Sequence, residues 1–169
     1  FERVLAAAPG FAAAHLARGV VLNALERHEA AIAAYDAAIA ADPGFPEAHF
    51  NRGNVLWTLR RTEAAIADYR RAIALRPAYA EAHNNLSVAL RDLGRLEEAI
   101  ASAGHAVDLA PDFAAAYNNR GIALKNLGRP DEAIADYERA ITRQPDFAEA
   151  HANLANILGE IKQTERALA

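Results

Sequence analysis

Ten asparagines are the residues of this 169-residue chain whose type and spacing could do specific chemistry. One adjacent pair, Asn84–Asn85 in EAHNNLSVAL, returns further along the chain as Asn118–Asn119 in AAYNNRGIAL. Asparagine is a poor helix former, because its short amide competes with the backbone for hydrogen bonds. A carboxamide offers both a donor and an acceptor, which is what a neutral side chain needs to bind peptide main chain. The pairs therefore suggest a binding surface built on helices.

The helices that carry the asparagines follow from a sequence repeat of constant length. Prolines recur at one fixed interval, and an aromatic residue stands two positions after each of them. The prolines are Pro9, Pro43, Pro77, Pro111 and Pro145. Small residues recur at the same interval at Gly19, Gly53, Ser87, Gly121 and Ala155. We therefore expect four full repeats, 12–45, 46–79, 80–113 and 114–147, flanked by the partial repeats 1–11 and 148–169.

Each repeat has the pattern of two helices. In 80–113, apolar residues keep helical spacing from Ala82 to Leu93, and a second stripe starts at Leu96. Gly94 supplies a helix end, and Glu97 opens the second helix, where a carboxylate complements the helix dipole. The apolar faces of such a hairpin can be buried only by stacking on neighbouring hairpins. The sequence thus predicts an all-α solenoid of about ten helices without strands.

The repeat resembles the tetratricopeptide repeat (TPR) family. The matching residues in 46–79 are His49, Arg52, Gly53, Leu56, Ala65, Tyr69 and Pro77. The resemblance implies a right-handed superhelix of helical hairpins that acts as a protein-interaction module. It also implies that one face of the first helix of every repeat lines a concave groove.

All ten asparagines lie in first helices, at the fifth, sixth, ninth, twelfth or thirteenth place of a repeat. These places form one helix face, opposite the stripe of small and leucine residues. Relative to alanine, each asparagine lowers the stability of a helix by up to about 0.7 kcal/mol. Ten asparagines therefore lower it by roughly 5 kcal/mol, which is comparable with the net stability of a small domain. Replacing Asn85 and Asn119 with alanine is therefore expected to raise the melting temperature while weakening the binding of a partner.

The sixth place holds a regular series, which we name the asparagine column. It consists of Asn51, Asn85, Asn119 and Asn153, with Ala17 in the first repeat. The column is similar to the asparagines inside the TPR arm of O-GlcNAc transferase, and this similarity implies contacts to the backbone of an extended polypeptide. Two interpretations stay open, namely recognition of main chain and a solvated polar surface inherited with the repeats.

An aromatic pair is confined to the repeat 46–79. Phe50, Asn54 and Trp57 are spaced four and three residues apart on the same face. Exposed phenylalanine and tryptophan beside a groove are typical binding anchors. The alternative is that Trp57 stacks on Arg91 of the next repeat. The predicted peptide-binding residues are Phe50, Asn51, Asn54, Trp57, Asn84, Asn85, Arg91, Asn118, Asn119, Lys125, Asn153 and Asn156.

An acidic C-terminal tail is not the expected ligand. Chaperone-binding TPR domains hold such a carboxylate with lysines, an arginine and two asparagines. Asn54 and Asn85 match the two asparagines, but the places of the cations hold Phe50, Ala115 and Asn119. A carboxylate there would meet no compensating charge.

A histidine column raises the question of a metal site. It consists of His15, His49, His83 and His151. Successive repeats place these rings roughly 8–10 Å apart, too far to share one zinc ion with bonds of about 2.0 Å. We expect the histidines to pack between helices. We expect the stems of Arg52 and Arg120 to cover apolar surface while their guanidinium groups reach water.

Composition argues against several functional classes. The chain has no cysteine, and it has neither a nucleophile paired with a base nor a phosphate-binding glycine loop, so no enzyme activity, cofactor or metal is expected. A net charge of -4 without blocks of like charge argues against nucleic acid and membranes as partners. No membrane span or signal peptide is evident, which favours the cytoplasm. Arginine outnumbers lysine 16 to 2, which suggests a bacterial source.

Three functions stay open at this point. The chain is an interaction module that holds an extended segment, the substrate-recruiting arm of a larger enzyme such as an O-GlcNAc-type glycosyltransferase, or a structural spacer. Neither end shows the polar capping helix that a solenoid needs. We therefore expect further chain beyond residue 1 or residue 169, or end-to-end stacking of molecules.

Overall fold

The computed structural model describes residues 11–168, with side chains described as far as residue 163. Within this range the backbone forms nine α-helices and no strands. The helices are α2 (Ala12–Ala24), α3 (His28–Ala41), α4 (Pro46–Thr58), α5 (Thr62–Leu75), α6 (Ala80–Asp92), α7 (Leu96–Leu109), α8 (Ala114–Asn126), α9 (Pro130–Arg143) and α10 (Ala148–Leu168). The helical fragment expected at 1–11 lies outside the described residues, apart from Phe11.

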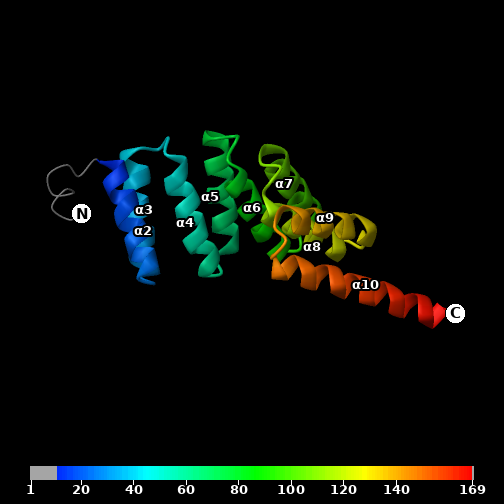
Figure 1. Ribbon diagram of the computed structural model, residues 1–169. Coiled ribbons are helices and arrows are strands. Elements are labelled where there is room, and N and C mark those ends of the chain that lie inside the picture. Colours follow the sequence, from blue (N-terminus) through cyan, green and yellow to red (C-terminus); the bar gives the residue numbers. More distant parts are fainter. Residues whose placement is uncertain (1–10, 169) are drawn as a thin grey trace.

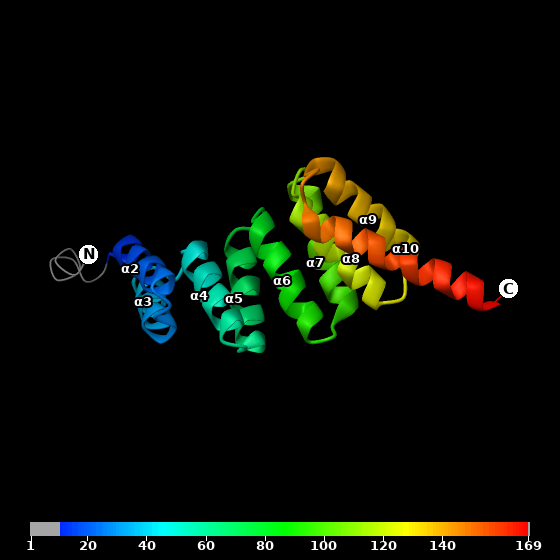
Figure 2. The same ribbon diagram turned by 60° about the horizontal axis from the view of Figure 1, so that its bottom comes forward.

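Consecutive helices form hairpins that stack in a row (Figure 1). The helix pairs are α2–α3, α4–α5, α6–α7 and α8–α9, and the second helix of each pair packs against the first helix of the next. The row changes direction along its length, so that α8 and α9 lie at an angle to α2 and α3 in both views (Figures 1 and 2). The predicted all-α solenoid is confirmed.

Each hairpin turn contains one residue with positive φ. Gly94 and Gly128 adopt φ values of 73° and 79°, as expected for glycines that end the first helix. In the first two hairpins the same conformation is taken by Glu26 and Arg60, at 55° and 60°. Acidic residues stand in the first turn of α3, α5, α7 and α9, where they complement the helix dipole.

Small residues let the helices of each hairpin approach closely. The tyrosine rings of three second helices lie against glycines of the first, in the pairs Tyr35–Gly19, Tyr69–Gly53 and Tyr137–Gly121. A Cβ atom added to Gly53 would lie 2.8 Å from Cε1 of Tyr69, which leaves no room for a side chain. In the third hairpin both partners differ, because Ser87 stands opposite Ala103 and both are buried. The tyrosine and the glycine are therefore replaced together.

The last repeat differs from the sequence-based expectation. Because Glu165 stands at the same place of its repeat as Glu97, a second helix is expected to begin near it, yet α10 runs without a break from Ala148 to Leu168 and extends away from the stack (Figure 1). Lys162 stands at the place where Glu26, Arg60, Gly94 and Gly128 adopt positive φ, and α10 continues through it in place of a turn. Even α10, at 21 residues, is not apolar enough to cross a bilayer, nor is any other helix in the described part of the chain.

Candidate peptide-binding groove

A pocket of about 370 Å³ opens among the first helices α4, α6 and α8. We call it the central pocket. It is lined by Asn54, Trp57, Thr58, Tyr69, Asn84, Asn85, Val88 and Asn119. Five of these residues are among those predicted to bind peptide, and they come from three successive repeats. Stacking of the hairpins therefore brings together side chains that lie far apart in the sequence.

The asparagines bond to one another across repeats. Three bonds, each 2.9 Å from Nδ2 to Oδ1, join Asn85 to Asn54, Asn119 to Asn84 and Asn153 to Asn118. In each case the donor belongs to the asparagine column and the acceptor belongs to the preceding repeat. The amides therefore fix the register of neighbouring first helices.

Two of the predicted groove residues are buried. Asn84 is 7% exposed but lines the central pocket, whereas Asn118 is 1% exposed, so the expectation that the fifth place faces the groove is wrong for Asn118. The reason is that the next first helix covers this place and supplies the amide donor that a buried oxygen needs. Asn51, Asn85, Asn119 and Asn153 keep partial exposure, and Asn156 is exposed on α10.

The hydrogen bonds change the expected result of the double substitution Asn85→Ala with Asn119→Ala. Alanine increases the stability of the helix by up to about 0.7 kcal/mol at each position, because it is the better helix former. The variant loses two bonds across repeats and the bond from Nδ2 of Asn84 to Oδ1 of Asn85, each contributing about 0.5–1.5 kcal/mol, and leaves the buried Oδ1 of Asn84 without its donor, at about 1–3 kcal/mol. We expect a net destabilisation of about 1–3 kcal/mol in urea unfolding, against the increase in melting temperature expected from propensity alone.

Asn156→Ala is the matched control for this prediction. Asn156 occupies the ninth place of its repeat, is exposed, and makes no side-chain hydrogen bond among the described residues. Its replacement should leave stability unchanged or raise it by a few tenths of a kcal/mol. If the double variant were as stable as the native chain or more stable, as the control should be, the bonds across repeats would contribute no net stability.

The aromatic residues are less exposed than the sequence suggested. Phe50 is half-buried, and its ring centroid lies 4.9 Å from that of Tyr79 and 6.1 Å from that of Tyr69. The expectation that Phe50 is an exposed anchor is therefore wrong, because the aromatic residue that ends its own repeat packs on it. Trp57 lines the central pocket and is also half-buried.

Trp57 is held in place by a residue that the sequence analysis did not pair with it. Its Nε1 donates to Oδ2 of Asp92 in α6 at 2.8 Å. Arg91, the expected stacking partner, lies beside the same carboxylate, with its Nη2 3.5 Å from Oδ1 of Asp92. The indole is thus bound at its edge by a hydrogen bond, which leaves its orientation fixed at the mouth of the pocket.

The charged residues predicted for the groove are paired. Nζ of Lys125 lies 2.7 Å from Oε1 of Glu160 in α10, and Arg91 has Asp92 as its neighbour. Both pairs are partly exposed and contribute little to stability. In each pair the acidic residue neutralises the cation to which a carboxylate ligand would otherwise bind.

The histidine column packs between helices only in part, because His49 is buried and His83 is half-buried, whereas His151 is exposed on α10. Nδ1 of His49 lies 3.2 Å from Oδ1 of Asp68, and Nε2 of His83 lies 3.1 Å from the backbone oxygen of Pro77. Burial lowers the pKa of His83, and the neighbouring His105 lowers this pKa further. No cluster of three or more histidine, aspartate or glutamate side chains suited to a metal ion occurs among the described residues.

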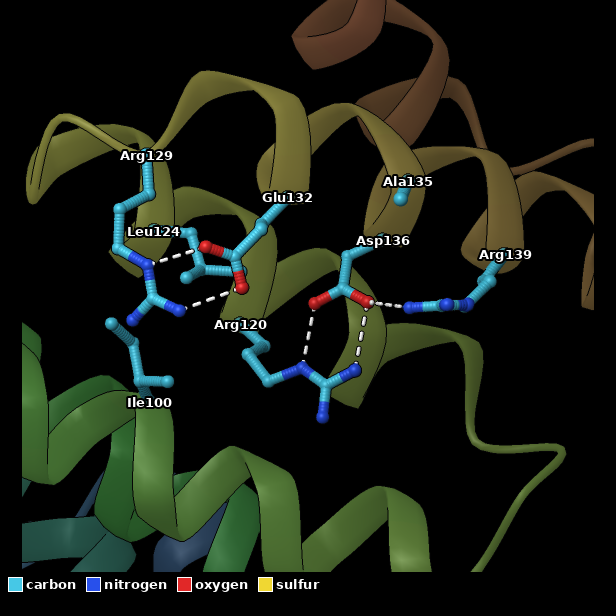
Figure 3. Close-up of a pocket in the computed structure, with 8 residues that line it drawn as sticks. All are labelled: Ile100, Arg120, Leu124, Arg129, Glu132, Ala135, Asp136 and Arg139. Atoms are coloured by element: carbon cyan, nitrogen blue, oxygen red, sulfur yellow. Dashed lines mark hydrogen bonds and ion pairs between the residues drawn. The ribbon is translucent and has the colours of Figure 1, made fainter.

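A second cleft, of about 310 Å³, lies on the side of the second helices α7 and α9 (Figure 3). Its floor includes Ile100 and Leu124, and its charged residues bind one another. Nε and Nη2 of Arg120 donate to the two carboxylate oxygens of Asp136 at 2.6 and 2.8 Å, and Nη1 of Arg139 donates to the same carboxylate at 2.9 Å. The remaining pair is Arg129 with Glu132. Since its cations are already bound, this cleft has a structural role.

Arg120 and Arg52 therefore do not behave as predicted. Their guanidinium groups bind the buried carboxylates of Asp136 and Asp68, and that of Arg52 also binds the exposed carboxylate of Asp36. The spacing from arginine to aspartate is the same in both repeats, and in the third repeat both partners change together, to Leu86 and Ser102. That joint change was the signal in the sequence, and comparing single columns missed it.

Four models of the tetratricopeptide repeat match the sequence, at residues 19–59, 50–112, 114–147 and 136–169. Together with the stacked helical hairpins, these matches show that the chain belongs to the TPR family. No curated protein matches the sequence.

Solved structures of TPR proteins are similar over most of the chain. The crystal structure of MamA is 26% identical, with a TM-score of 0.80 over 88% of this chain and 86% of MamA. TTC0263, a TPR protein of Thermus thermophilus, is 27% identical, with a TM-score of 0.72 over 93% of this chain and 86% of that protein. The first TPR domain of Spaghetti (RPAP3), bound to the HSP90 peptide SRMEEVD, is 26% identical, with a TM-score of 0.68 over 69% of this chain and 93% of that domain.

Proposed function

We propose that this chain is a protein-interaction module that binds an extended polypeptide segment along its first helices, mainly through the segment's main chain. One observation carries the proposal: carboxamides from three successive repeats line a single pocket, each held in a defined orientation by a bond to the neighbouring repeat. Preorganised donors and acceptors bind a ligand without a further entropic cost of ordering.

The spacing of the asparagine column suits an extended chain. An extended segment advances about 3.3 Å per residue, and TPR helices pack roughly 8–10 Å apart, so one amide serves about every third ligand residue. Asn85 and Asn119 each use one Nδ2 hydrogen on the preceding repeat. The second hydrogen of each amide is then available to a carbonyl of the ligand.

The chemistry of this groove differs from what an acidic tail needs. A structural neighbour is bound to the peptide SRMEEVD, which supports peptide binding as the activity of the fold. In this chain the places of the carboxylate-binding cations hold Phe50, Ala115 and Asn119. We therefore propose a neutral or basic extended segment. The similarity of the asparagine column to that of O-GlcNAc transferase is compatible with a free-standing module and with a recruiting arm of a larger enzyme.

The double variant Asn85→Ala with Asn119→Ala also tests this function. Capped nine-residue peptides would be selected from a random library for binding to the full chain. Because two hydrogen bonds to main chain are lost, the affinity of a selected peptide should fall by about 1–3 kcal/mol, or roughly 5–150-fold, at a temperature where the variant remains folded. Asn126→Ala, at an exposed position at the end of α8 and outside the predicted binding residues, should change the affinity less than twofold. Equal affinities for the double variant and the native chain would leave the amides with a structural role alone.

A further inference from the structure

We propose that the central pocket selects a carboxamide side chain, glutamine or asparagine, at one position of the bound segment. The inference rests on the proposed function, because it concerns one side chain of a segment that the groove holds by its backbone. It names the specificity that the groove would show.

The pocket has no charged residue in its lining. Its walls are amides, hydroxyl groups, an indole and an isopropyl group. The cations predicted for the groove are each paired with a carboxylate, Arg91 with Asp92 and Lys125 with Glu160 of α10. A charged side chain entering the pocket would lose its hydration and meet no counter-charge, which is costly for either sign.

The free donor and acceptor in the lining match a carboxamide. Oδ1 of Asn54 accepts from the hydroxyl of Tyr69 and from Nδ2 of Asn85, both at 2.9 Å, which fixes the orientation of this amide. Nδ2 of Asn54 then has no partner among the described residues, and it can donate to a ligand. Asn119 donates through Nδ2 to Asn84, which leaves its Oδ1 as an acceptor. A glutamine side chain offers one oxygen and two N–H groups to this pair.

The apolar walls suit the methylene groups of the same side chain. Trp57 and Val88 line the pocket, and the hydrogen bond to Asp92 holds the indole at its mouth. Trp57 occurs at this place in one repeat, whereas Arg91 and Lys125 take the place in the next two. The pocket is therefore specific to one point along the groove. A leucine ligand would use the walls but would leave the free amide groups unpaired.

The experiment uses capped nine-residue alanine–serine peptides with glutamine, leucine, glutamate or lysine at the central position, titrated into the full chain. Because two hydrogen bonds distinguish them, the glutamine peptide should bind about tenfold more tightly than the leucine peptide, and the charged peptides should bind more weakly than leucine. Equal binding of all four peptides would overturn the pocket's selectivity and leave the proposed function standing. Binding of none of them would overturn both.

Asn54→Asp gives a second test that does not depend on removing a side chain. The carboxylate still accepts from Tyr69 and Asn85, but it has no N–H to donate and it places a negative charge in the pocket. The variant should lose the preference for glutamine and favour the lysine peptide. Asn126→Asp, at an exposed position at the end of α8 and outside the predicted binding residues, should leave the order of the four peptides unchanged. An unchanged order in the Asn54→Asp variant would overturn the assignment.

Discussion

Replacing Asp136 with alanine is expected to destabilise the fold by about 3 kcal/mol or more. The carboxylate is 2% exposed and the guanidinium of Arg120 is 20% exposed, so the two form a largely buried bidentate pair. Removing one partner leaves the other charge buried without compensation, which typically costs about 3–5 kcal/mol. Urea unfolding followed by circular dichroism measures the loss.

The third repeat supplies the matched control for this prediction. Arg120→Leu combined with Asp136→Ser reproduces the pair Leu86 and Ser102, which packs at the same place. Because no unpaired charge remains, the double variant should recover most of the stability that Asp136→Ala loses, and should lie within about 1 kcal/mol of the native chain. A double variant as unstable as the single one would show that packing, and not the unpaired charge, dominates at this site.

Tyr137→Ala is the second substitution with a large expected effect. The ring is fully buried against Gly121, and burial raises the pKa of its hydroxyl to about 12. Removing it opens a cavity beside Gly121, which has no side chain to fill it. We expect a loss of about 3–5 kcal/mol in the free energy of unfolding.

Adding Gly121→Ser to Tyr137→Ala should recover part of this loss. In the native chain a Cβ at Gly121 would lie 2.7 Å from Cε1 of Tyr137, so Gly121→Ser alone should also destabilise the fold. Together the two changes reproduce Ser87 and Ala103 of the third repeat. The double variant should therefore be clearly more stable than the sum of the two single effects. Strict additivity would contradict the close approach of glycine and tyrosine as the basis of hairpin packing.

The fold could be predicted from the sequence because its constant period is carried by residue types with a direct structural meaning. Gly94 and Gly128 end helices, and alanine columns allow close packing. The end of α10 could not be predicted from that period, because the repeat pattern continues there while the helix runs on through Lys162, at the place where the other hairpins turn.

The candidate site was predicted in part. The asparagines meet on the first helices, yet the sequence did not reveal that Asn84 and Asn118 are buried acceptors. Reading a repeat column by column treats each place separately, whereas these bonds join the sixth place of one repeat to the fifth place of the repeat before it. Phe50 was assigned to the surface for a similar reason, because its partner Tyr79 stands at the far end of the same repeat, in a different column.

Binding of main chain by the asparagine column is the central claim, and Trp57 gives the most direct test of it. Trp57 is the only tryptophan and lines the central pocket, so its emission reports on this site. A selected nine-residue peptide should shift the emission to shorter wavelength as it fills the pocket. Analogues in which one peptide unit is replaced by an (E)-alkene, which removes its carbonyl, should bind about 2–12-fold more weakly at every third position and normally elsewhere, since one hydrogen bond contributes about 0.5–1.5 kcal/mol. Alkene analogues that all bind as tightly as the parent peptide, with the same spectral shift, would contradict recognition of the main chain.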